Sequence, residues 1–197
     1  MYGFFAKVLT VNVGDRTSGS DELDAARLAA DMGGKGLGSR LLLERNPAGV
    51  DPLAPESHLV MALGPATDSP IHGSCRHGLF AKSPLTGLYS ESYAGGSAAI
   101  AMSRTGYDAF DITGASDRPL WVEISDQGVL FHDAEDLWGL DTFETEAALR
   151  KRVAARSPTV LTIGPAGESL VRFAVVKNDG WRVCGRTGMG AILGSKK

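Results

Sequence analysis

Two short glycine clusters, one near each end of the chain, most constrain how this sequence can fold. Residues 33–38 read Gly-Gly-Lys-Gly-Leu-Gly and residues 185–190 read Gly-Arg-Thr-Gly-Met-Gly, and an apolar run follows each cluster. Glycine adopts positive φ readily and lets a ligand approach the main chain closely. A helix that starts at such a cluster directs free N–H groups toward an anion. The clusters therefore predict two backbone sites for phosphate or another polyanion.

The composition predicts one large folded domain or two small ones. The chain has 197 residues, of which 43% are hydrophobic, enough to form a core and to argue against global disorder. The net charge of −3 gives no electrostatic footprint for nucleic acid, and no basic run indicates a membrane patch. Glycine accounts for 25 residues, well above the average of about 7%. Its clustering indicates special backbone sites rather than a flexible linker.

Cysteine and histidine usage argues against a metal site in this chain. The two cysteines, Cys75 and Cys184, are too few and too far apart for a zinc or iron–sulfur motif. The histidines are scattered, with no two at ligand spacing on a helix. The N-terminus lacks the charged start and long apolar region of a signal peptide, and no apolar stretch reaches 18 residues. We therefore expect a cytoplasmic protein.

Hydrophobic patterning predicts more strands than helices. Helices are expected at residues 21–32, 37–45 and 141–154, the last with a capping-box-like start at Asp141 and Glu144. The expected elements do not alternate regularly, which favours an α+β fold over a doubly wound α/β fold. Strands are expected at residues 4–13, 58–63, 76–82, 107–113, 120–125, 129–132, 160–163 and 171–176.

A weak internal repeat links two distant segments. Residues 60–69 and 160–169 both contain an apolar strand, then Gly-Pro-Ala, then an acidic residue followed by Ser. The glycine clusters occur in the opposite order relative to these segments, so a simple tandem duplication does not explain both features. Two interpretations stay open: a pseudo-twofold arrangement, or a coincidence of common turn chemistry.

Several short motifs follow one another along the whole chain. Residues 76–87 end in Lys-Ser-Pro-Leu-Thr-Gly, residues 106–109 read Gly-Tyr-Asp-Ala, and residues 163–168 read Ile-Gly-Pro-Ala-Gly-Glu. The closing run, 185–196, has the form Gly-Arg-x-Gly-x-Gly-Ala-x-x-Gly-Ser-Lys. Each motif alone is weak, but the ordered set resembles the tungsten-containing aldehyde:ferredoxin oxidoreductases specifically.

The resemblance implies a fold and a cofactor. In that family the N-terminal domain is the base on which a tungsten bis-pyranopterin cofactor sits. We therefore expect residues 1–197 to form one such domain, an α+β fold with two mainly antiparallel sheets in a pseudo-twofold relation and a few flanking helices. The metal could be tungsten or molybdenum. The [4Fe–4S] cluster would belong to further domains or to a partner chain.

The resemblance also implies an activity. The family oxidises aldehydes to carboxylic acids and passes the electrons to ferredoxin, so the expected partners are the remaining domains or an iron–sulfur subunit and a ferredoxin-like acceptor. A homo-oligomer is compatible with the sequence. We expect no catalytic residue in this chain and no activity of the chain alone. The alternatives are a family reductase acting on another substrate, such as an aromatic thioester, and a non-catalytic binding or assembly module.

Seven positions match the family's pterin contacts. Glycine N–H groups bind phosphate without side-chain bulk, and arginine adds planar, bidentate hydrogen bonds. Two positions depart from the family pattern: Tyr93 stands where the family commonly has Asn, and Val183 where it usually has Ala. The predicted cofactor-binding residues are Arg76, Tyr93, Gly95, Arg182, Val183, Gly185 and Arg186.

Overall fold

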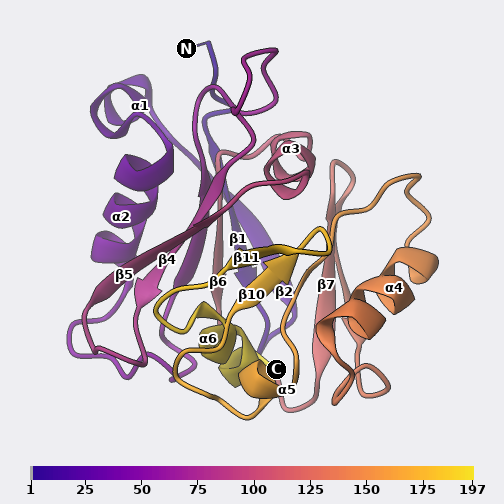
Figure 1. Ribbon diagram of the computed structural model, residues 1–197. Coiled ribbons are helices and arrows are strands. Elements are labelled where there is room, and N and C mark those ends of the chain that lie inside the picture. Colours follow the sequence, from indigo (N-terminus) through magenta and orange to yellow (C-terminus); the bar gives the residue numbers. More distant parts are fainter. Residues whose placement is uncertain (1) are drawn as a thin grey trace.

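The largest element of the fold is a six-stranded sheet with strand order β2-β1-β6-β3-β4-β5 (Figure 1). The computed structural model describes residues 2–197. Within this range β1 and β6 pair in parallel, and every other neighbouring pair in this sheet is antiparallel. The strands are β1 (Lys7–Asn12), β2 (Thr17–Glu22), β3 (Leu59–Leu63), β4 (His77–Lys82), β5 (Tyr89–Ala94) and β6 (Ala109–Thr113).

Two helices, α1 and α2, cover one face of this sheet. The side chain of Asp24 caps α1, which satisfies one of the free N–H groups of the first turn. Leu37 and Leu41 of α2 are fully buried in a core that they share with Phe80 of β4. This core holds α2 across the middle of the sheet. The helices are α1 (Ala25–Asp31) and α2 (Gly34–Arg45).

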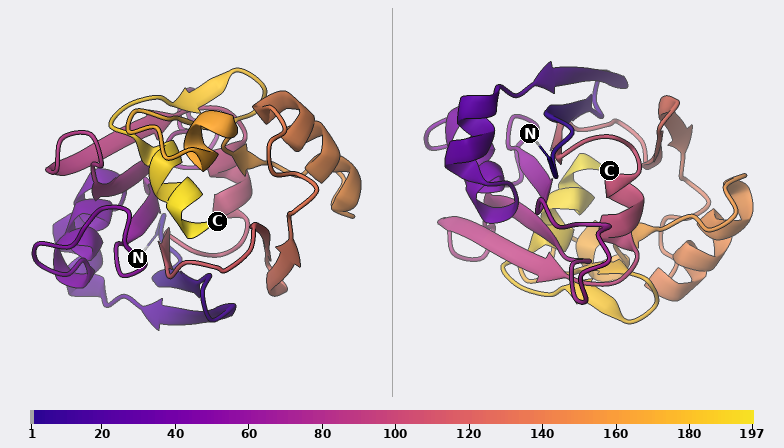
Figure 2. Two further views of the ribbon diagram at one scale, coloured as in Figure 1. Left: turned by 90° about the horizontal axis from the view of Figure 1, so that it is seen from below. Right: turned by 90° about the horizontal axis from the view of Figure 1, so that it is seen from above.

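A second core on the opposite face joins the large sheet to a three-stranded sheet with order β11-β10-β9. Leu79, Val176, Cys184 and Ile192 are each less than 2% exposed in this core. Figure 2 shows α2 on one side of the large sheet and α6 on the other. The elements of this layer are α3 (Ala98–Ser103), β9 (Leu161–Thr162), α5 (Pro165–Glu168), β10 (Val176–Asn178), β11 (Arg182–Cys184) and α6 (Met189–Lys196).

The β7–β8 hairpin and helix α4 share a third, smaller core at one side of the molecule (Figure 1). Asp141 accepts hydrogen bonds from the first turn of α4, and Glu144 bonds back to the Asp141 N–H at 3.1 Å. The predicted capping box is therefore confirmed. Among the residues described, none of the helices has the length and apolar character needed to cross a bilayer. The elements are β7 (Leu120–Ser125), β8 (Gly128–Asp133) and α4 (Thr142–Arg152).

The structure contains two related strand–strand–strand–helix units. The first is β3-β4-β5-α3 and the second is β9-β10-β11-α6, and in each the middle strand pairs antiparallel with both neighbours. The Gly-Pro dipeptides of the sequence repeat, at Gly64 and Gly164, follow the first strand of each unit. The predicted α+β class is confirmed, and the weak sequence repeat marks corresponding points of the two units.

Two predicted elements were wrong in part, and some strands were not predicted at all. The first residues of the predicted helix 21–32 belong to β2, a strand whose side chains are all exposed, so no apolar alternation revealed it. Most of the predicted strand 171–176 has no strand structure, since β10 begins only at Val176. Strand β5 was not predicted, because its buried positions are mainly serines rather than the apolar residues that mark a strand.

Candidate functional site

The segments that carry the seven predicted residues meet at one side of the fold. His77 pairs with Ala94 between β4 and β5, which places Arg76 opposite Gly95 at the end of this strand pair. Strand β11 lies against β5, although the two belong to different sheets. Arg182 lies at the start of β11. Residues more than 100 positions apart are thereby brought to one strand edge.

Hydrogen bonds attach β10 and the chain after β11 to β5 and to the segments at its two ends. The Asn178 side chain donates to the Gly95 carbonyl at 3.0 Å, and the Arg186 N–H donates to the Ser92 hydroxyl at 3.1 Å. Farther along, the Ser83 hydroxyl donates to the carbonyl of Thr187 at 2.8 Å. The bonds at Arg186 and Thr187 position the second glycine cluster through its backbone. The arginine side chains of the segment take no part in them.

The register identifies which positions of the two units correspond. Ala94 pairs with the first residue of β4, and Cys184 pairs with Val176, the first residue of β10. Residues 93–95 therefore correspond to residues 183–185, and the loops after them lead into α3 and α6 respectively. Four of the seven predicted residues, Tyr93 with Val183 and Gly95 with Gly185, are thus two structurally equivalent pairs.

This correspondence corrects the pairing of the glycine clusters. The counterpart of the cluster at 185–190 is the Gly95 loop, not the cluster at 33–38. In the first cluster α2 already begins at Gly34, and two glycines have packing reasons. A Cβ on Gly36 would collide with the Asp31 carbonyl, and one on Gly38 would collide with the ring of Phe80.

The strand edge carries unpaired positive charge beside open space. Arg76, Arg182 and Arg186 are exposed, and within residues 2–197 their guanidinium groups make no hydrogen bond or salt bridge to the protein. No atom lies within 4 Å of the position of a Cβ on Gly95. Free guanidinium groups next to accessible backbone are the chemistry that binds phosphate and polar heterocycles. The residues present therefore fit an anionic, hydrogen-bonding cofactor.

The two departures from the family pattern direct no hydrogen-bond donor into this space. The Tyr93 hydroxyl donates to Glu91 at 3.2 Å, and the residue is 38% exposed. Val183 is 44% exposed and has only an apolar side chain. Any polar contacts at these two positions would therefore come from the main chain.

We call the strand edge that carries Arg76, Arg182 and the Gly95 and Gly185 loops the cradle. A buried polar pair lies beneath it and was not found from the sequence. His77 is 1% exposed, and its Nε2 lies 3.7 Å from the Cys184 Sγ. Burial lowers the pKa of His77 to about 4 and raises the pKa of Cys184 to about 12, so both groups are neutral at pH 7. The His77 Nδ1 has no hydrogen-bond partner in the described part of the chain. No local pattern links two residues 107 positions apart.

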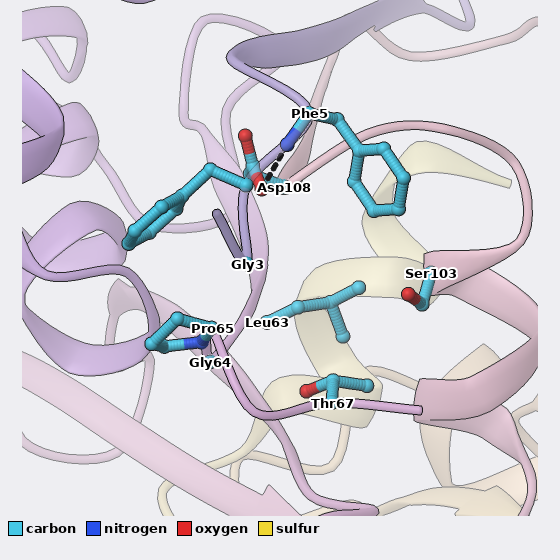
Figure 3. Close-up of a pocket in the computed structure, with 9 residues that line it drawn as sticks. Gly3, Phe5, Leu63, Gly64, Pro65, Thr67, Ser103 and Asp108 are labelled. Carbon is cyan, nitrogen blue, oxygen red and sulfur yellow. Dashed lines mark hydrogen bonds between the residues drawn. The ribbon is translucent and has the colours of Figure 1, made fainter. Parts of the chain in front are cut away.

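A separate hollow near the N-terminus is lined by Asp108, whose carboxylate is engaged in hydrogen bonds within the protein (Figure 3). Asp108 accepts hydrogen bonds from the N–H groups of Phe5 and Lys7 at 3.1 and 3.3 Å. Burial raises the pKa of the Asp108 carboxyl, against the effect of these hydrogen bonds. Its contacts attach the N-terminal segment beside the end of β3. This hollow is therefore a structural junction.

Comparison with protein-family models and with characterised proteins gives consistent matches. The model described as "Aldehyde ferredoxin oxidoreductase, N-terminal domain" matches residues 8–197. The chain is 38% identical over 196 residues to the tungsten-containing aldehyde ferredoxin oxidoreductase of Pyrococcus furiosus, covering 100% of this chain and 32% of that protein. It is 37% identical to the protein of the same name from Thermococcus kodakarensis, covering 100% of this chain and 33% of the relative.

A solved structure has the same fold. It is the active site complex BamBC of benzoyl coenzyme A reductase in complex with 1,5-dienoyl-CoA, which aligns with a TM-score of 0.95 and 29% sequence identity. The alignment covers 99% of this chain and 30% of that chain. The chain thus spans about a third of the length of the proteins that it matches.

Proposed function

Because the chain belongs to the aldehyde ferredoxin oxidoreductase family, we propose that it is the cofactor-binding N-terminal domain, or a subunit equivalent to it, of a tungsten-dependent oxidoreductase. In this proposal residues 1–197 are one domain and the strand edge between β5 and β11 binds a tungsten or molybdenum bis-pyranopterin. The observation that carries the proposal is a group of three arginines, unpaired within residues 2–197, beside two structurally equivalent glycine loops.

The chain's own residues would bind and orient the cofactor. Backbone N–H groups of the Gly95 and Gly185 loops would bind phosphate or a ring edge, because neither residue carries a side chain that blocks approach. Arg76, Arg182 and Arg186 would supply the positive charge. When bound, the cofactor supplies two-electron redox chemistry, as cofactors commonly carry the reaction that protein side chains cannot. Tyr93 would contact it through its main chain, and Val183 through its main chain and methyl groups.

The proposed reaction is oxidation of an aldehyde to a carboxylic acid, with electrons passed through an iron–sulfur cluster to a ferredoxin in the cytoplasm. The names of the relatives support this reaction. The cluster and the acid–base groups would belong to further domains or to a partner chain, since this chain spans only about a third of its relatives. The 197 residues alone would then bind cofactor without turnover.

A second candidate is a subunit of a reductase that acts on an aromatic thioester. The structural match to a benzoyl coenzyme A reductase complex favours it. The identity to that structure is 29%, against 38% to the aldehyde ferredoxin oxidoreductase of Pyrococcus furiosus. Aldehyde oxidation is therefore the preferred proposal.

Native purification together with any co-purifying chains tests the proposal. Tungsten or molybdenum, pterin and an iron–sulfur partner should be found together. Reduction of ferredoxin with aldehydes, compared with turnover of aromatic coenzyme A thioesters, then separates the two substrate classes. A preparation with neither metal, no pterin and no partner would contradict the proposal and favour a non-catalytic binding or assembly module.

A further inference from the structure

The Tyr93 side chain folds back across β4 instead of extending toward the Gly95 loop. Tyr93 pairs with Gly78, and a Cβ on Gly78 would lie only 2.8 Å from the Tyr93 ring. The ring also meets Phe80 edge-on, with centroids 5.9 Å apart and an interplanar angle of 85°. Phe80 pairs with Glu91, two positions farther from the Gly95 end of the strand pair. The ring therefore extends away from the cradle.

A single carboxylate holds the end of this side chain. The Glu91 Oε2 accepts hydrogen bonds from the hydroxyls of Tyr93 and Tyr89, at 3.2 and 3.0 Å. Its Oε1 accepts one from the Lys35 Nζ at 2.9 Å. Tyr89 is held in turn by a hydrogen bond with the Ser39 hydroxyl at 2.6 Å. Lys35 and Ser39 belong to α2, so the carboxylate connects the start of this helix to the exposed face of β5.

The protonation states of Glu91 and Tyr93 favour their hydrogen bond at neutral pH. The hydrogen bond from Lys35 lowers the pKa of Glu91, so the carboxylate stays ionised and accepts hydrogen bonds. Burial, together with the Glu91 charge, raises the pKa of Tyr93 to about 12, so the phenol stays protonated and donates. An exposed ion pair adds little to global stability, which means that removing it should have mainly local effects.

We propose that Glu91 is a positioning residue of the cofactor cradle: it holds the Tyr93 phenol over Gly78 and thereby keeps the space beside Gly95 open. This inference rests on the proposed function. Without the carboxylate, the phenol hydroxyl loses its acceptor. Its side chain is then free to rotate about the Cα–Cβ bond toward the open space beside Gly95. The structure also gives Lys35 a role: it anchors Glu91 rather than binding an anion directly.

Tyrosine titration of the 197-residue chain tests the contact between Glu91 and Tyr93 without any cofactor. The four tyrosines are followed by NMR of ring-labelled protein between pH 8 and 11, and Tyr93→Phe assigns the signal. In the wild type, Tyr93 should not reach its midpoint in this range. In Glu91→Ala its pKa should fall toward the ordinary value of about 10. An unchanged Tyr93 titration would overturn the proposal.

The pterin and metal content of single and double variants, measured in the complete native assembly, tests the positioning role. Glu91→Ala should lower the pterin and metal content several-fold, whereas Glu91→Gln, which keeps an acceptor for the phenol, should retain it. Glu91→Ala combined with Tyr93→Ala should restore the content, because no phenol is left to enter the cradle. The matched control combines Glu91→Ala with Tyr89→Ala, which removes the other tyrosine on the same carboxylate and should not restore it.

Two outcomes of this second test contradict the inference: full cofactor content in Glu91→Ala, or equal restoration by the Tyr93 and Tyr89 changes. A wild-type assembly that contains no pterin would instead refute the proposed function. In that case the tyrosine titration still decides whether Glu91 raises the pKa of Tyr93.

Discussion

Asp179 accepts hydrogen bonds from both the backbone N–H and the hydroxyl of Ser97, at 2.5 and 2.8 Å. Asp179 lies in the turn between β10 and β11, and Ser97 precedes α3 in the other unit. The same carboxylate also accepts the N–H of Ala98 at 3.2 Å. A carboxylate of one unit therefore accepts the hydrogen bonds of N–H groups at the start of α3 in the other unit. These bonds hold the Gly95 and Gly185 loops in a fixed relative position.

Replacing Asp179 with alanine should weaken this attachment between the two units. Several backbone and hydroxyl groups lose a charged acceptor at once, so the free energy of unfolding should fall by about 1–3 kcal/mol. Urea denaturation monitored by circular dichroism measures the change. Asp126→Ala is the control, because Asp126 is exposed in the β7–β8 turn. Equal, small effects of the two substitutions would show that the Asp179 contacts do not hold the loops.

Replacing Arg76 and Arg182 together with alanine should lower cofactor retention without destabilising the chain. Both side chains are exposed and make no hydrogen bond or salt bridge to the rest of residues 2–197, so no structural bond is lost. Metal and pterin analysis of the complete assembly measures retention. Arg118→Ala, a change at another exposed arginine, is the control for loss of charge. Unchanged metal content in the double variant would argue strongly against these two residues as cofactor contacts.

Removing Glu146 should destabilise the fold through its effect on Lys177. Lys177 is 3% exposed, and its Nζ lies 2.5 Å from the Glu146 Oε2. In Glu146→Ala the ammonium group is left buried without its counter-ion, a change that typically costs about 3–5 kcal/mol.

The double variant Glu146→Ala, Lys177→Met separates this charge effect from lost packing. It should recover much of the loss in the free energy of unfolding, measured by urea denaturation. Asp136→Ala, which breaks the exposed pair with Arg152, should change stability little. A double variant no more stable than Glu146→Ala would show that the packing of Glu146, and not the charge of Lys177, is responsible.

The buried His77 should make stability depend on pH below neutrality. Its folded pKa of about 4 lies below the ordinary value of about 6.5, so between these values the unfolded chain binds the proton and the folded chain does not. The free energy of unfolding should therefore decrease as the pH falls from about 6.5 to 4, by up to about 3 kcal/mol.

Carboxylates titrate near the lower end of the same window, so the test compares variants. The difference in the free energy of unfolding between wild type and His77→Leu should change steadily between pH 7 and 4.5. His72→Leu, at an exposed histidine, should run parallel to the wild type. A constant difference between wild type and His77→Leu would show that His77 is protonated equally in both states.

Structural features could be predicted from the sequence where residues close together in the chain decide them. The capping box of Asp141 and Glu144 is such a case, since both partners lie within one helical turn. The strand–Gly-Pro pattern at Gly64 and Gly164 is another. Strands β2 and β5 escaped prediction, because they are edge strands whose polar residues give no apolar alternation.

The sequence by itself determined the parts of the candidate site: the arginines, the glycine loops, the Gly-Pro repeat and the resemblance to a family, which the comparisons confirm. The tertiary structure decided which parts meet. It pairs the Gly185 loop with the Gly95 loop rather than with residues 33–38, places Arg76 opposite Gly95 and aims Tyr93 at Glu91. The first relationship joins distant residues through the packing of two sheets, and the second comes from the pairing of β4 with β5. The third depends on Tyr93 and Glu91 lying on one face of a strand that no apolar pattern marks.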